Sequence, residues 1–135
     1  MLFSWDYGKI CPACVISQYV EGQIRIIKAW HGKIISVKGL YNKKVRPFVA
    51  KYLRNIEIEM IGNPANTGEG RDQLEEIGYM VENAPTNNVE IRINSVRNAL
   101  NELVDGQPRI IISKANCSDL IRGFRGKYRY KNVRS

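Results

Sequence analysis

The sequence predicts an α/β domain built on a mixed sheet, and two features of its layout carry that prediction. Three strand patterns come first, and the second and third form a hairpin. Helix and strand patterns then alternate to the end of the chain. A meander followed by such alternation is typical of antiparallel and parallel strands in one sheet with helices on its faces. The 135 residues, with 44% hydrophobic and 25% charged, suit one globular domain and exclude a disordered chain.

The first half is expected to hold four strands and one helix. Residues 2–6 predict a strand, and residues 14–20 and 23–30 predict a hairpin closed by Glu21-Gly22. A helix is predicted to begin close to Pro47, because apolar residues recur there at helical spacing. This stripe consists of Val45, Phe48, Val49, Tyr52 and Leu53. Alternation over residues 56–60 then predicts a strand that stops at Gly62-Asn63-Pro64.

The second half alternates between short helices and strands. Residues 63–71 predict a loop, residues 72–77 a helix ended by Gly78, and residues 79–81 a strand. The stretch from Val89 fits both periods, and its length favours a helix that ends at Asp105-Gly106. Residues 109–113 predict a buried strand, and residues 118–123 a last helix.

The apolar runs, the cysteines and the charge indicate the cellular compartment and the kind of partner to expect. No apolar run is long enough to span a bilayer, and the start lacks the pattern of a signal peptide. An odd number of cysteines, three, does not suit a disulfide framework, so we expect the reducing cytoplasm. Most of the net charge of +8 lies between Arg122 and Arg134, which hold six basic residues and no acid between them. Such a run is either a solvated end of the chain or a contact for a polyanion.

Cys11-Pro12-Ala13-Cys14 has the spacing of a redox or metal-binding motif, but the rest of the sequence gives little support to either function. A redox Cys-x-x-Cys pair needs a helix N-terminus, and a strand pattern follows here. Cys11, Cys14, Cys117 and His31 would supply the four ligands of a structural zinc, but nothing in their spacing requires it. Buried or incidental thiols are therefore the preferred interpretation, and a small zinc protein remains an alternative. His31 has no catalytic partner in any readable motif and is interpreted as structural.

Two polar residues end predicted strands. Asp6 ends the first strand, and Asn63 follows the strand that stops at Gly62. If these strands are parallel neighbours, the two side chains face each other at a sheet edge, where sites collect. Two carboxylates there would hold divalent cations for phosphodiester cleavage, whereas one carboxylate and one amide would hold them less well. The alternatives are a turn-capping aspartate and an Asn-Pro turn.

The end of the chain interleaves basic and aromatic residues. Lys and Arg neutralise phosphates, and Phe and Tyr stack on bases. The same alternation also suits an edge strand with one packed and one charged face. On balance, we expect contact with nucleic acid through Arg122, Arg125, Lys127, Arg129 and Lys131.

Taken in order, the motifs resemble the nuclease domain of the bacteriophage terminase large subunit, an RNase H-like fold. Asp6-Tyr7-Gly8, then Pro12-Ala13, Gln18 and Gly22, resemble its first strand and hairpin. Residues 62–66 with Arg71 resemble its Gly-Asp-Pro-Ala-Gly signature and downstream arginine. The closing half is similar at residues 88–100, 106–113, 116–117, 120–121, 123–124 and 126–128. The resemblance covers nearly the whole chain.

The resemblance implies a metal-dependent endodeoxyribonuclease of viral DNA packaging. It implies Mg²⁺ or Mn²⁺ held at Asp6 and at the position of Asn63, and double-stranded DNA contacted by Arg71 and the basic tail. It also implies a terminase ATPase domain and a portal as partners, in the cytoplasm of a bacterial host. Residues 1–135 are expected to form one nuclease-type domain truncated after its last strand.

The departures from the family's pattern predict weak or absent cleavage. Asn63 stands where the family has an aspartate, and the chain stops at Ser135, before the family's last catalytic aspartate. No Walker motif of the ATPase is present. The alternative function is a non-catalytic nucleic-acid-binding or assembly module with the same fold.

Overall fold

The computed structural model describes residues 1–8, 10–63, 68–85 and 89–122. Their elements are, in chain order, β1 (Leu2–Asp6), β2 (Ala13–Val20), β3 (Gln23–His31), α1 (Val37–Leu40), the π-helical turn η1 (Tyr41–Val45), α2 (Arg46–Tyr52), β4 (Glu59–Gly62), α3 (Glu69–Ile77), β5 (Val81–Asn83), α4 (Val89–Asn101), β6 (Leu103–Val104), β7 (Gln107–Pro108), β8 (Ile110–Ile112) and α5 (Ser118–Arg122).

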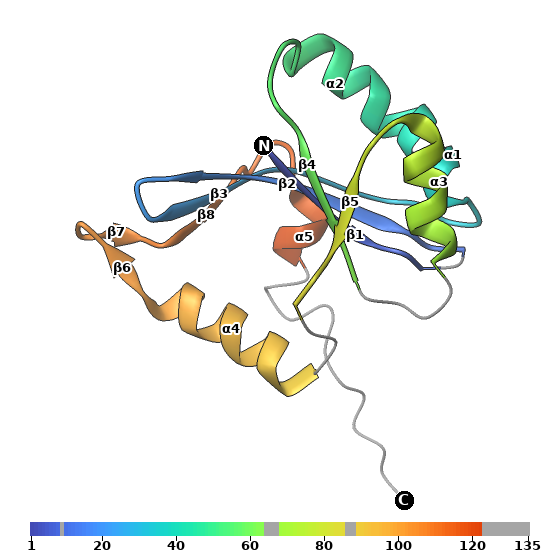
Figure 1. Cartoon of the computed structure of the whole chain (residues 1–135). Helices are drawn as coiled ribbons and strands as arrows, with labels where there is room; N and C mark the ends of the chain where they lie inside the picture. Colours follow the sequence, from blue (N-terminus) through green and yellow to red (C-terminus); the bar gives the residue numbers. More distant parts are fainter. Residues whose placement is uncertain (9, 64–67, 86–88, 123–135) are drawn as a thin grey trace, which may run out of the picture.

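A six-stranded mixed sheet forms the centre of the fold (Figure 1). Its order is β5-β4-β1-β2-β3-β8, with β2 antiparallel to both β1 and β3. The pairs β1–β4, β4–β5 and β3–β8 are parallel. The carboxyl ends of β1, β4 and β5 therefore meet at one edge of the sheet. This arrangement confirms the predicted mixed sheet of an antiparallel hairpin and parallel strands.

The hairpin of β2 and β3 is closed by the two residues that the sequence indicated. Glu21 has φ of 49° and Gly22 has φ of 87°, so both lie in the left-handed region. Two-residue turns of this hand match the twist of paired strands. Glycine adopts that conformation at no steric cost, whereas Glu21 does so as an exception among side-chain-bearing residues.

The helical layer after β3 begins earlier than predicted. It starts at Val37 rather than near Pro47, because the Ser36 hydroxyl accepts a hydrogen bond from the Gly39 N–H at 3.0 Å and caps α1. The wide π-helical turn η1 then joins α1 to α2, so the chain stays helical from 37 to 52. Four of the five residues of the predicted stripe are buried or pack against the core: Val45, Phe48, Val49 and Leu53. The exception is Tyr52, which is 58% exposed.

One core lies between this layer and the sheet. Phe3, Trp5 and Ile16 of the sheet pack against residues of α1, η1 and α3. The buried helical side chains are Val37, Leu40, Tyr41, Val45 and Leu74.

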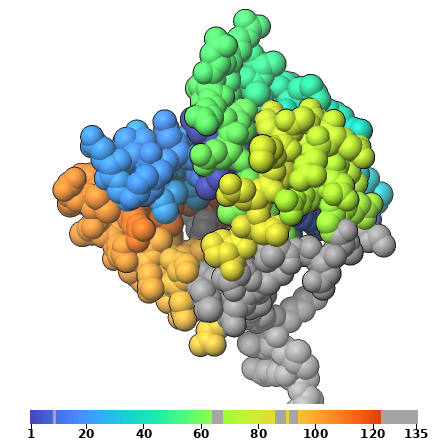
Figure 2. Space-filling model, in the orientation of Figure 1, coloured from blue at the N-terminus to red at the C-terminus, as the bar shows by residue number. Residues whose placement is uncertain are grey.

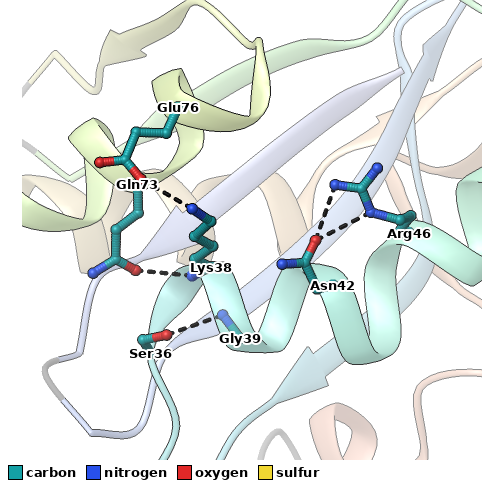
Figure 3. Close-up of polar contacts among 7 residues, drawn as sticks. All are labelled: Ser36, Lys38, Gly39, Asn42, Arg46, Gln73 and Glu76. Atoms are coloured by element: carbon teal, nitrogen blue, oxygen red, sulfur yellow. Dashed lines mark hydrogen bonds and ion pairs between the residues drawn. The ribbon is translucent and has the colours of Figure 1, made fainter.

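Polar contacts fasten α1 to α3 at the surface (Figure 3). The Lys38 backbone N–H donates to Gln73 Oε1 at 2.9 Å, and its ammonium group pairs with Glu76 at 3.0 Å. Tyr41 and Tyr79 share a hydrogen bond of 2.6 Å closer to the sheet.

The remaining boundaries differ by a few residues from the expectations. β4 covers Glu59–Gly62, and Ile56 precedes it and is exposed. α3 begins at Glu69 inside the predicted loop, and β5 lies two residues later than expected. The larger difference is at Asp105-Gly106, where left-handed φ angles close a small hairpin of β6 and β7 instead of ending α4.

Helices cover both faces of the sheet, as predicted. The helices α1, α2 and α3 lie on the face of Phe3 and Trp5. On the opposite face, α5 and the residues before it border a cleft of about 410 Å³ over Ala13, Val15 and Ala29. None of the helices in the described ranges has the length and apolar character that a bilayer crossing requires.

Candidate functional site

The ends of β1 and β4 bring Asp6 and Asn63 together. The parallel register pairs Trp5 with Gly62, and the Asn63 N–H donates to the Trp5 carbonyl at 3.3 Å. Asp6 and Asn63 follow directly, so alternation places both on the face opposite Trp5. The parallel pairing of these two strands, on which the predicted site depends, is confirmed. Neither side chain points into the apolar core, since Asp6 is exposed and Asn63 is partly exposed.

The amide of Asn63 is already engaged by the backbone. Its Oδ1 accepts a hydrogen bond from the Tyr7 N–H at 3.1 Å. This contact extends the pairing of β1 and β4 by one step, with a side chain in place of a carbonyl. The other amide atom, Nδ2, is a donor and has no lone pair to offer a cation.

Tyr7 fixes this corner of the fold with its ring. A Cβ atom added at Gly62 would overlap the Tyr7 hydroxyl, and one added at Gly70 would lie 2.5 Å from Tyr7 Cδ1. The ring therefore occupies the space that these two glycines leave between β4 and α3. Burial raises the pKa of the Tyr7 phenol, an effect that Arg71 opposes. Sequence reasoning did not identify this role of Tyr7, although Gly62 and Gly70 were the available signal.

A divalent cation fits these residues poorly. Asp6 supplies one carboxylate, whereas Asn63 offers an amide oxygen that a backbone donor already uses. Across the described ranges, no three His, Cys, Asp or Glu side chains are grouped closely enough to hold a metal. Hard divalent cations need several oxygen ligands, and carboxylates above all. The chemistry of this donor set therefore does not suit the cation that the sequence resemblance implies.

A second polar group lies further along the same sheet edge. The register places His31 in one row with Asp6 and Ala13. His31 Nε2 lies 3.0 Å from Asp119 Oδ2 of α5, and Arg122 pairs with the other oxygen of Asp119. His31 therefore links β3 to α5, which agrees with a structural interpretation.

The three thiols do not converge on one centre. Cys14 is buried in the core beneath the helical layer, and burial raises its pKa. Cys117 is buried at the cleft on the opposite face, and Cys11 is exposed. This geometry gives no support to the zinc alternative.

The predicted DNA-binding residues are only partly within the described structure. Arg71 lies on α3, where its Nε donates to Glu75 Oε1 at 3.1 Å. Arg122 ends α5 and is paired with Asp119. The other predicted contacts, Arg125, Lys127, Arg129 and Lys131, lie outside the described residues.

Solved structures show what this architecture is similar to. The nuclease domain of the bacteriophage SPP1 large terminase, solved with bound Mn, matches with a TM-score of 0.61 and 18% identity, over 96% of this chain and 69% of that one. The P22 large terminase nuclease domain matches with 0.61 and 14%, over 99% and 72%. The chain has the large terminase nuclease fold. The resemblance stated from the sequence is thereby confirmed for the fold.

A longer solved structure shows what share of a large terminase the matched region covers. The large terminase of the thermophilic bacteriophage D6E matches with a TM-score of 0.70 and 18% identity. The match covers 91% of this chain but 30% of that protein. No protein-family model matches the sequence, and no curated protein does.

Proposed function

We propose that this chain is a nuclease-type domain of a viral DNA-packaging terminase that contacts double-stranded DNA and cleaves it weakly or not at all. The terminase nuclease fold supports the first part of this proposal. The single observation that carries the second part is the hydrogen bond between Asn63 Oδ1 and the Tyr7 N–H. At the position where the family's pattern has a carboxylate, this chain has a neutral amide whose oxygen accepts a hydrogen bond from the backbone.

The cofactor of such a domain would be Mg²⁺ or Mn²⁺, and the SPP1 nuclease domain contains Mn. In this chain, Asp6 and Asn63 are the residues we assign to that position. Because a single carboxylate provides half the charge of a pair, we expect any cation to be held weakly. An ATPase domain, supplied by the same or another chain, and a portal complete the proposed packaging context, in the cytoplasm of a bacterial host.

Nicking of supercoiled plasmid in Mn²⁺ tests the catalytic part. We expect little or no nicking by the unaltered chain and more by the Asn63→Asp variant, because this variant restores a second carboxylate beside Asp6. Adding Asp6→Ala to Asn63→Asp should abolish the gain, and this double variant is the matched control. Robust nicking by the unaltered chain that survives Asp6→Ala would show that Asp6 and Asn63 are not the site.

The observation on Asn63 also favours a second candidate, a non-catalytic nucleic-acid-binding module. That candidate predicts binding that depends on salt and on the basic residues from Arg122 onward, but not on Asp6. With six phosphate contacts, the slope of log affinity against log salt would approach about −5. A slope near zero would exclude those residues from DNA binding.

A further inference from the structure

The basic residues of η1 and α2 form an unpaired cationic surface. Five side chains belong to it and are called here the η1–α2 basic face; they are Lys43, Lys44, Arg46, Lys51 and Arg54. All five are exposed. The later part of α2 projects from the molecule and leads into the turn toward β4 (Figures 1 and 2).

Several cations elsewhere in the described residues are paired with carboxylates, whereas those of the η1–α2 basic face are not. Lys38 pairs with Glu76, Arg71 with Glu75, and Arg109 with Glu102. Within the described part of the chain, no carboxylate forms an ion pair with any member of the η1–α2 basic face. Figure 3 shows the contrast between Lys38, which is held by α3, and Arg46, which bonds only the neutral Asn42.

The remaining contacts of this face leave its charge intact. Arg46 stacks on the Tyr41 ring at 5.1 Å, and Lys51 lies 5.1 Å from the centre of the exposed Tyr52 ring. The Arg54 Nε donates to the Ala50 carbonyl at 3.1 Å. Each contact is to a neutral group and orients the side chain.

The sequence around this face contains no compensating acid. Between Glu21 and Glu57 there is no Asp or Glu, whereas nine basic residues fall in that interval: Arg25, Lys28, Lys33, Lys38, Lys43, Lys44, Arg46, Lys51 and Arg54. Like charges one turn apart on a helix are unfavourable. Lys43 and Arg46 stand three residues apart, and neither η1 nor α2 has an acid in its first turn. The arrangement thus costs the folded chain some stability unless an anion neutralises it.

We infer that the η1–α2 basic face binds the phosphate backbone of double-stranded DNA, as a second contact surface beyond Arg71 and the basic tail. From Lys43 to Lys51 the helix advances about 12 Å, at about 1.5 Å per residue, and Arg54 follows in the turn after α2. One strand of B-DNA presents about one phosphate per 3.4 Å of axis, so this helical length faces three or four phosphates. The cations therefore match a duplex in sign, and the helix that carries them matches it in length. This inference rests on the proposed DNA partner but not on cleavage.

This face lies away from Asp6 and Asn63. α1 starts close to the carboxyl end of β1, where Ser36 and Val37 border the same pocket as Tyr7 and Gly8. The helical layer then runs toward the opposite sheet edge, because α2 is followed by the start of β4 at Glu59. A duplex held here is thus bound for positioning, and it is not presented to the Asp6 corner by this face.

Three variants, each lacking three charges, test the inference. The first replaces Lys43, Lys44 and Lys51 with Gln and keeps Arg46 and Arg54, whose contacts support the helix. The matched surface control replaces Lys33, Arg97 and Lys114 with Gln, and the tail variant replaces Arg125, Lys127 and Arg129 with Gln. The affinity for a short fluorescein-labelled duplex is followed by anisotropy against salt concentration.

For the first variant, we expect the slope of log affinity against log salt to fall by about 2.7, which is about 0.9 for each lost contact. If the curves meet near 1 M salt, this corresponds to about 100-fold weaker binding near 0.15 M. The surface control should bind as the unaltered chain does. The melting temperature of the first variant should be unchanged or higher, which separates lost binding from lost folding.

Each other outcome overturns the inference. If the first variant and the surface control bind alike, the η1–α2 basic face does not contact DNA. If only the tail variant loses affinity, DNA remains the partner and this face is not its surface. If an acidic polypeptide at equal charge displaces the duplex as well as unlabelled duplex does, the ligand is not DNA in particular. If the unaltered chain binds no duplex, the proposed DNA partner itself is wrong.

Discussion

The Asn63→Asp substitution should lower stability in the absence of divalent cations and restore it in their presence. The new carboxylate keeps the acceptor for the Tyr7 N–H but stands beside Asp6 on the neighbouring strand. Neighbouring strands are about 5 Å apart. Two like charges at that separation cost about 0.8 kcal/mol in bulk water and about 3 kcal/mol at an effective dielectric of about 20. Because Asp6 is exposed, we expect a loss of about 1 kcal/mol in chelator.

Urea denaturation with chelator and with Mn²⁺ measures both halves of this prediction. A cation held by the carboxylate pair stabilises the folded state by about 2.7 kcal/mol at a concentration of about 100 Kd. The variant should gain clearly more from Mn²⁺ than the unaltered chain. The charge-swapped control, Asp6→Asn with Asn63→Asp, keeps one carboxylate at the corner and should lose both effects. If Asn63→Asp matches the unaltered chain in chelator and in Mn²⁺, the two side chains do not share a site.

Four further predictions concern burial. Tyr7→Phe should leave the free energy of unfolding unchanged or raise it by up to about 1 kcal/mol, because among the described residues the Tyr7 hydroxyl is buried without a hydrogen-bond partner. Gly70→Ala should lower the free energy of unfolding by about 1–3 kcal/mol, because the added methyl group would contact the Tyr7 ring. Urea denaturation measures both changes. An aromatic disulfide reagent should modify Cys11 rapidly, while Cys14 and Cys117 react only on unfolding. Because burial raises the pKa of the Cys14 thiol, the unfolded chain releases its proton above the ordinary value of 9.0 while the folded chain keeps it. The free energy of unfolding should therefore keep the full contribution of the buried thiol below pH 9 and fall by up to about 1.4 kcal/mol per pH unit above it. Cys14→Ala should flatten that decline in urea titrations.

Local patterns predicted the sheet well, because its strands follow rules that act over a few residues. The β2–β3 hairpin follows from β-branched runs around a two-residue turn, and β8 follows from an uninterrupted apolar run. The prediction that β8 is buried was wrong, because β8 lies at the edge of the sheet and Ile111 is 41% exposed. The helical layer was predicted less well. Its start depends on the Ser36 cap and its length on the π-helical turn η1, and neither follows from a 3.6-residue period. Asp105-Gly106 was misassigned because the same residues end helices and close hairpins.

The position of the candidate site was predictable, and the state of its residues was not. Strand ends and a parallel pairing placed Asp6 beside Asn63 from the sequence. The hydrogen bond that Asn63 Oδ1 accepts from the Tyr7 N–H spans 56 residues of sequence, and no local pattern contains it. The η1–α2 basic face was visible in principle as an interval without acids. It was not predicted as a binding surface, because the positive charge after Arg122 is denser.

The chemistry at this corner favours an amide wherever no metal is bound. Two carboxylates at adjacent strand ends repel each other unless a cation lies between them. A nuclease site built on such a pair therefore lowers the stability of the fold whenever the metal is absent. Asn63 removes that repulsion and keeps the one oxygen that β1 requires for the Tyr7 N–H. The Tyr7 ring packs against Gly62 and Gly70 at the same corner, between β4 and α3. Under the proposed function, Asn63 stabilises the metal-free domain, and restoring the acid should reveal the repulsion directly.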